Sequence, residues 1–152
     1  MTSDDSPAGT VPSAETGPAA VGELMKPATT TVEARAHLAA AAYLMKRSGS
    51  SALVVVTDDG DGERPVAVVT DADISHAVAD GKDPGDTRIT DLDVGNPFTV
   101  APDTPVREVA RLMLSTGTQH VPVAEGGRLI GMVDMADVCR ILLATQDGRV
   151  SA

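Results

Sequence analysis

Aromatic side chains are almost absent from this chain of 152 residues, which has one Tyr, one Phe and no Trp. Tyr43 and Phe98 are these two residues. The hydrophobic share is nevertheless 42%, which is enough to build a core. That core has to consist of Val, Ala, Leu, Ile and Met, and the length predicts one compact domain.

Cysteine is nearly absent as well, since Cys139 is the single one. One cysteine excludes an internal disulfide, and its apolar neighbours predict a small buried side chain. The first twenty residues lack the basic start and apolar run of a signal peptide. No hydrophobic run is long enough to cross a bilayer. We therefore expect a protein of the reducing cytoplasm that does not bind membranes.

Basic residues are outnumbered by acidic ones, 12 against 22, and the net charge is -10. This balance excludes proteins that hold nucleic acid or anionic lipid through their overall field. An anionic ligand would need a local cation or a set of backbone N–H groups.

Catalytic signatures are missing too. The chain has no Gly-Lys-Ser/Thr phosphate loop, no Gly-x-Gly-x-x-Gly and no nucleophile elbow. His37, His76 and His120 lie in separate predicted elements without the spacing of metal ligands. The sequence therefore predicts a protein that is not an enzyme.

The chain does contain an internal repeat. Apolar and glycine positions recur at a separation of 68, and after the predicted hairpin turn the separation becomes 64, because DDGDGER in the first copy is longer than EGGR in the second. We expect a disordered leader over 1–20, repeats over 21–80 and 89–144, a linker over 81–88 and a frayed tail over 145–152.

Each repeat reads strand, helix, strand, turn, strand, helix, which predicts an α/β fold. In the second repeat Thr104 is the predicted N-cap and Pro105 the first helical residue. A helical stripe follows, and the first repeat has its counterpart: Val106, Val109, Ala110 and Met113, matched by Leu38, Ala41, Ala42 and Met45. The hairpin strands are almost wholly apolar, so both faces of each sheet should be covered.

Oxygen-bearing side chains gather after one of these strands, at Thr70, Asp71 and Asp73 in AVVTDADI. Thr-x-x-Asp before an apolar helix fits a capping box, and Asp134 and Asp137 can cap the second repeat in the same way. Acid/base catalysis would require carboxylates in contrasting environments. A metal site would require further oxygen ligands, and none is identifiable. The third alternative is a site that holds a polyol.

Four features in fixed order resemble the CBS domain: VGELM at the start of a repeat, a VPV strand, the EGGRLIGMVDMAD hairpin, and Thr-x-x-Asp at the strand-to-helix junction. Two copies resemble the tandem arrangement known as a Bateman module. The resemblance implies β-α-β-β-α units packed sheet to sheet around pseudo-two-fold clefts. Such clefts bind AMP, ADP, ATP or S-adenosylmethionine, with the aspartate on the ribose hydroxyls.

Carried over residue by residue, the resemblance implies two clefts, each lined by both repeats. The first holds Thr70, Asp73 and His120 at ribose and phosphate, with Val68, Phe98, Thr118 and Gln119 around adenine. The second holds Thr30, Ser50, Ser51, Met132, Asp134 and Asp137, and we expect it to be the weaker site, because Asp134 adds a negative charge where a phosphate would approach. In the first cleft, Ala67 places a methyl where the family has Gly against the ligand.

The predicted function is therefore regulatory sensing of an adenosyl ligand, without catalysis, through an unknown protein target. A homodimer formed through the helices is expected. The alternative is a ligand-free assembly module in which both junctions are only helix caps.

Overall fold

The protein is described here from a computed structural model, over residues 20–27, 30–94 and 98–151, with side chains to residue 144. The first repeat contributes β2 (Thr31–Glu33), α1 (Leu38–Ser48), β3 (Ala52–Asp58), β4 (Glu63–Thr70) and α2 (Asp71–Ala79). The second contributes α3 (Val106–Thr116), β5 (His120–Glu125), β6 (Arg128–Asp134) and α4 (Met135–Ser151). A short strand, β1 (Lys26–Pro27), precedes them.

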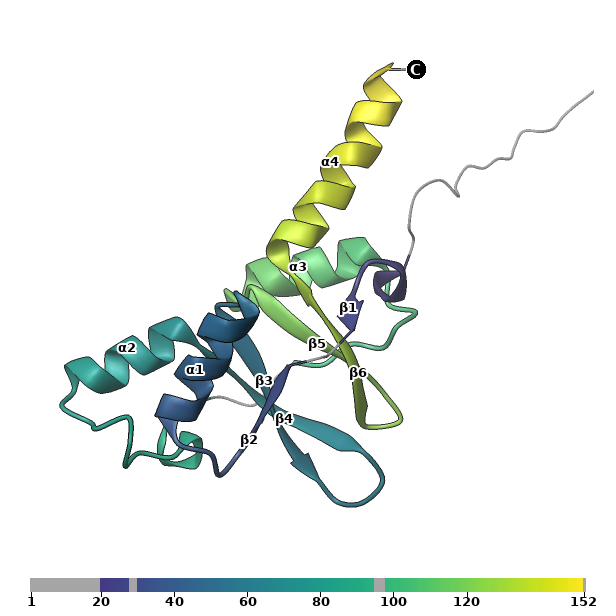
Figure 1. Cartoon of the computed structure of the whole chain (residues 1–152). Helices are drawn as coiled ribbons and strands as arrows, with labels where there is room; N and C mark the ends of the chain where they lie inside the picture. Colours follow the sequence, from purple (N-terminus) through teal and green to yellow (C-terminus); the bar gives the residue numbers. More distant parts are fainter. Residues whose placement is uncertain (1–19, 28–29, 95–97, 152) are drawn as a thin grey trace, which may run out of the picture.

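The strands form two three-stranded sheets, in the orders β2-β3-β4 and β1-β6-β5. The sheets lie side by side with helices outside them, and α4 projects away from the body (Figure 1). Both hairpins carry a bulge at equivalent places, between Val55 and Val56 and between Val123 and Ala124. The predicted mixed α and β architecture of two repeated units is confirmed.

The apolar strands are covered on both faces, as expected. Five consecutive residues of β3, from Ala52 to Val56, are buried. Strand β4 contacts β5 and β6 of the other sheet, while α1 packs on β2 and β3. Strand β3, the middle strand of its sheet, therefore lacks the alternation of an exposed sheet, whereas the ends of β4 and β6 alternate buried with half-buried residues.

The helical stripes are buried at Leu38, Ala41 and Met45 in α1 and at Val106, Val109 and Met113 in α3. Both helices end on a glycine in the left-handed region, Gly49 at φ 69° and Gly117 at φ 72°. The predicted Thr104 N-cap is wrong by one residue. The Pro105 carbonyl accepts the first helical bonds, from the N–H groups of Glu108 and Val109, so α3 begins at Val106.

The segment that leads into each repeat packs on the other one. Val21 belongs to the core beneath α3, and its N–H donates to the Thr104 carbonyl at 2.8 Å. Ile89 belongs to the core beneath α1, and its N–H donates to the Ala36 carbonyl at 2.9 Å. The repeat seen in the sequence is therefore not the unit of packing.

The two ends of the chain differ in how much of them the structure describes. The predicted leader lies outside the described residues except for Ala20, which forms a β-bridge with Pro105. The predicted tail is helical, because α4 continues through Ser151 without a proline to stop it. Cys139 lies on this helix and is exposed, so its predicted burial is wrong: α4 directs Val138 rather than Cys139 into the core.

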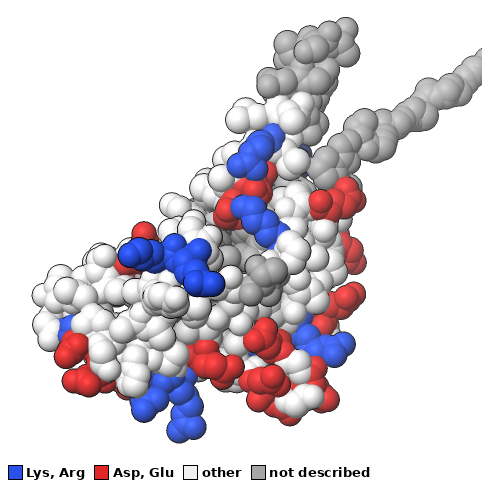
Figure 2. All heavy atoms as spheres, in the orientation of Figure 1, with Lys and Arg blue, Asp and Glu red and all other residues white. Residues whose placement is uncertain are grey.

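Across the described residues, no helix combines the length and hydrophobicity needed to cross a membrane. Acidic side chains gather at the lower edge of the molecule, over the β3–β4 turn (Figure 2). The β3–β4 turn alone carries Asp58, Asp59 and Asp61.

Candidate ligand-binding clefts

The first cleft brings together residues that lie far apart in the sequence, from Ser51 to His120. All seven side chains predicted for it line one cavity of about 470 Å³: Val68, Thr70, Asp73, Phe98, Thr118, Gln119 and His120. Ser51, Asp71, Ala72 and Gly117 complete the lining. The volume falls within the range of roughly 300–1,000 Å³ that is usual for small-molecule sites.

The junction between β4 and α2 forms one end of this cleft. The Thr70 hydroxyl accepts from the Asp73 N–H at 3.2 Å, and the Asp73 carboxylate accepts from the Thr70 N–H at 2.8 Å. The Thr70 hydroxyl also donates to Asp73 Oδ2 at 3.0 Å. The predicted capping box is present.

All of these bonds to the carboxylate go to Oδ2. Asp73 Oδ1 has no hydrogen-bond partner among the described residues. The Asp73 side chain is half-buried and lines the cleft. Capping therefore leaves one carboxylate oxygen available to a ligand.

Charge in the first cleft comes from Asp71 and Asp73, and its described lining contains no Lys or Arg. His120 is the remaining titratable side chain of that lining. Burial lowers the pKa of His120, and the carboxylates of Asp134 and Asp71 offset this only in part. The imidazole is therefore mainly neutral at pH 7, so the cleft offers a phosphate little positive charge.

The apolar part of the first cleft is made by Val68 and Phe98. Phe98 is 46% exposed and contributes the phenyl ring of the lining. Ala67 behaves differently from the expectation: it is 4% exposed and packs in the core beneath α1, because its position on β4 alternates with Val68. Its methyl does not line the cleft.

The second cleft has a volume of about 330 Å³. Thr30, Ser50, Ser51, Met132 and Asp134 all line it, as predicted from the resemblance, and Asp137 does not. The Asp137 side chain is only 8% exposed and turns to charged neighbours. Ser51 and His120 line both clefts, so the two cavities share a wall.

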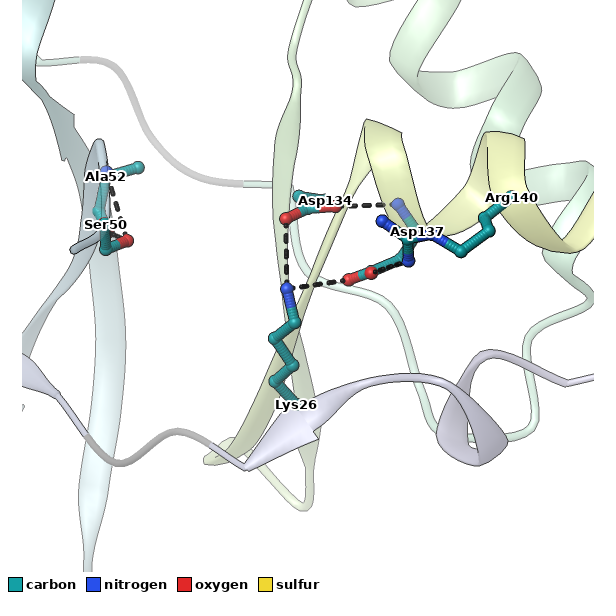
Figure 3. A network of polar contacts seen from close by, with 6 residues as sticks. All are labelled: Lys26, Ser50, Ala52, Asp134, Asp137 and Arg140. Atoms are coloured by element: carbon teal, nitrogen blue, oxygen red, sulfur yellow. Dashed lines mark hydrogen bonds and ion pairs between the residues drawn. The ribbon is translucent and has the colours of Figure 1, made fainter. Parts of the chain in front are cut away.

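A network of four charges closes the Asp134–Asp137 junction (Figure 3). Lys26 Nζ lies 3.4 Å from Asp134 Oδ2 and 3.4 Å from Asp137 Oδ2. Arg140 Nη1 donates to Asp137 Oδ1 at 2.8 Å, and the Asp137 N–H donates to Asp134 Oδ1 at 2.8 Å. Each negative charge therefore faces a positive one.

The pKa values of this network follow its geometry. The charges of Asp134 and Asp137 raise the pKa of Lys26. Burial pushes the pKa of Asp134 upward, but the N–H of Asp137 and the charge of Lys26 outweigh it, so the pKa of Asp134 is lowered. The negative charge expected at Asp134 is therefore paired with Lys26, and the expected weakness of this site stays a prediction.

Lys26 is a charged residue of the second cleft that sequence reasoning missed. It lies on β1, which pairs with β6 of the second repeat in the register Lys26 to Met132. The repeat offset gives no warning, because its counterpart 68 positions on is Val94. Lys26 reaches this cleft because the segment that leads into the first repeat packs on the second one. The sequence does not reveal that packing, so no signal in it pointed to Lys26.

Metal binding has no support in the part of the chain that the structure describes, where no three His, Cys, Asp or Glu side chains are grouped as ligands. Both clefts offer hydrogen-bond acceptors and apolar walls. The first also offers the N-terminus of α2, and the second the ammonium of Lys26.

Comparison with known proteins finds relatives in an archaeon and in a bacterium. Uncharacterized protein MK0525 of Methanopyrus kandleri is 29% identical over 66% of this chain and 50% of its own length. Uncharacterized protein YlbB of Bacillus subtilis is 37% identical over 64% of this chain and 65% of its own length. The chain thus spans half to about two thirds of these relatives.

A solved structure extends the comparison. The CBS domain protein PAE2072 of Pyrobaculum aerophilum, complexed with AMP, superposes with a TM-score of 0.75 at 28% identity, over 84% of this chain and 98% of that one. The family profile described as CBS domain matches residues 21–80 and 89–144. Because the two matches, one on each repeat, together cover most of the sequence, the chain belongs to the CBS domain family, as a tandem pair.

Proposed function

We propose that this protein is a regulatory module that binds an adenosyl ligand in its first cleft and acts through binding rather than catalysis. The observation that carries the proposal is the convergence of Thr70, Asp73 and His120 with an apolar wall in one cavity. The AMP complex of PAE2072 supports the ligand class.

The chemistry of the Asp73 junction supports a ribose. A carboxylate that accepts from both vicinal hydroxyls makes two charge-assisted hydrogen bonds, each worth about 1.5–3 kcal/mol. Oδ1 is available for this role, while Oδ2 holds the cap. Phe98 and Val68 offer apolar surface to the adenine.

The negative charge of the first cleft favours adenosyl ligands that carry few phosphates. Asp71 and Asp73 are not balanced by a Lys or Arg of the described lining, so each added phosphate meets repulsion. The N-terminus of α2 offsets part of it through N–H groups and a partial positive charge. AMP, adenosine and S-adenosylmethionine are therefore favoured over ADP and ATP.

Isothermal titration with AMP, adenosine, ATP and S-adenosylmethionine tests this function. Asp73→Asn keeps an acceptor for the cap and removes the charge that strengthens the ribose bonds. We expect the affinity to fall at least about tenfold, which corresponds to roughly 1.4 kcal/mol.

Asp71→Asn is the matched control, because it makes the same charge change in the same cleft without touching the capping box. It should leave adenosine binding unchanged and strengthen AMP binding slightly. Equal affinity for wild type and Asp73→Asn, with both variants folded by thermal melting, would contradict the proposed site.

An assembly function is the second candidate, and exposed apolar side chains favour it. Leu114 is 77% exposed, Leu143 62%, Tyr43 61% and Val78 51%, and each lies on a helix. Covering such surface drives association. A homodimer through the helices is proposed on this basis, and light scattering of Leu114→Asp against the neighbouring control Ser115→Asp tests it.

Both functions need a partner. We propose a protein target in a reducing cytoplasm, reached by a shift between packings of the two repeats. The ligand can shift that equilibrium only as far as its affinity differs between the two states.

A further inference from the structure

We infer that Lys26 closes the second cleft to ribose and so makes the chain a single-site binder, an inference that rests on the proposed adenosyl function. Lys26 is a specificity-determining residue in this proposal: its ammonium occupies the acceptors that the second Asp junction would otherwise offer to a ligand.

The first step is the position of the ammonium. Lys26 Nζ lies 3.4 Å from one oxygen of each carboxylate, Asp134 Oδ2 and Asp137 Oδ2 (Figure 3). An ammonium carries three donors, which compete for the same oxygens as the two hydroxyls of a ribose. The counterpart of Lys26, 68 positions on, is the uncharged Val94, so no ammonium at that position covers Asp73.

The second step is the state of the buried acceptor. Asp137 is 6% exposed, and its Oδ2 has no hydrogen bond within the described part of the chain, only the ion pair with Lys26. A buried acceptor without a hydrogen bond is unfavourable. An incoming hydroxyl would satisfy it if the ammonium moved away.

The third step concerns the remaining polar groups of the second cleft. Asp134 Oδ1 accepts from the Asp137 N–H, and the Ser50 hydroxyl on the opposite wall donates to the Ala52 carbonyl at 2.8 Å (Figure 3). These groups are already bound within the protein. The first cleft differs, because Asp73 Oδ1 is available.

The Lys26 side chain is 67% exposed, so it can leave the junction without breaking the core. Lys26→Met keeps the aliphatic stem and removes the ammonium. Isothermal titration and native mass spectrometry of the full chain with adenosine and with AMP measure the stoichiometry. We expect one ligand per chain in wild type and two in Lys26→Met.

Lys82→Met is the matched control, because this exposed lysine lines neither cleft and the charge change is the same. It should bind one ligand. Lys26→Met combined with Asp73→Asn should keep one site, and adding Asp137→Asn to that pair should remove it.

One ligand per chain in a folded Lys26→Met, or two equally tight ones in wild type, overturns the inference and leaves the proposed function standing. No ligand in wild type but one in Lys26→Met supports the closure by Lys26 and overturns the first cleft as the site. No ligand in any variant overturns both.

Discussion

The two strand-to-helix junctions, 70–73 and 134–137, occupy equivalent places in the repeats but use their carboxylates differently. Asp73 serves the cap through Oδ2 and leaves Oδ1 available. Asp137 is held by Arg140 at one oxygen and faces Lys26 at the other. Equivalent sequence positions have thus produced one accessible carboxylate and one that is enclosed in ion pairs.

The cause of the difference lies outside the junctions. The Thr70 hydroxyl both donates to and accepts from Asp73, whereas the Asp134 carboxylate can only accept, so Asp137 receives no hydrogen bond from the side chain at the cap position. Lys26 and Arg140 then supply the missing donors. The two clefts therefore differ in chemistry because Asp134 replaces Thr at the junction and because β1, a strand from the other repeat, brings Lys26 to it.

The largest effect that would sharpen this comparison is expected at Gly131, the counterpart of Ala67. A Cβ at Gly131 would lie 2.8 Å from the Lys26 carbonyl oxygen and 2.6 Å from Met25 Sδ. Overpacking of this kind costs about 1–3 kcal/mol. Gly131→Ala should lower the free energy of unfolding by that amount in urea titrations.

The same substitution should displace β1, which carries Lys26, and so raise ligand occupancy of the second cleft. Ala67→Gly is the reciprocal control, and it should affect stability without changing stoichiometry. An unchanged unfolding midpoint for Gly131→Ala would show that β1 is not held against β6 as described.

An intermediate effect on the free energy of unfolding is expected from changing the cap residues Thr70 and Asp134. Thr70→Ala removes an N-cap hydroxyl and should cost about 1 kcal/mol. Asp134→Thr keeps a cap in α4 and should cost less at pH 7. The two variants differ most in acid, and thermal melts from pH 7 to pH 2.5 measure this.

The sign follows from the lowered pKa of Asp134 in the folded protein. Its stabilising contribution is complete above the ordinary value of 3.8 and is lost as the pH falls through the lowered folded value. Asp134→Thr lacks this loss, so it should approach wild type in stability as the pH falls. If the stability of Asp134→Thr and that of wild type changed in parallel with pH, the Lys26–Asp134 interaction would be contradicted.

The smallest effect is expected at His120, which stands where the first repeat has the buried Ala52. Its folded pKa lies below the ordinary 6.5. Below pH 6.5 the unfolded chain therefore takes up a proton before the folded one, and stability falls until the lowered pKa is passed.

His120→Gln should remove this component from the unfolding free energy between pH 7.5 and pH 5. His76→Gln on the exposed face of α2 is the control and should follow wild type. If His120→Gln also followed wild type, burial of the shared wall between the clefts would be in doubt.

Much of the fold was predictable from particular residues. The repeat offset matched the hairpins, the stripe through Leu38, Ala41 and Met45 gave α1, and Thr70 with Asp73 gave the capping box. The pairing of Asp137 with Arg140 at i, i+3 was also within reach of the sequence. The role of the site residues remains a prediction that ligand binding has to test.

By itself, the sequence determined that the chain is duplicated, that the middle of its apolar strands is buried, and that each junction carries oxygen-bearing side chains that can cap a helix. These properties depend on local spacing and on hydrophobic pattern, which are written along the chain. Only the tertiary structure decided which segment meets which junction. The segment from Val21 to Lys26 packs on the second repeat, and that long-range pairing, invisible to periodicity, sets Lys26 against Asp134 and Asp137.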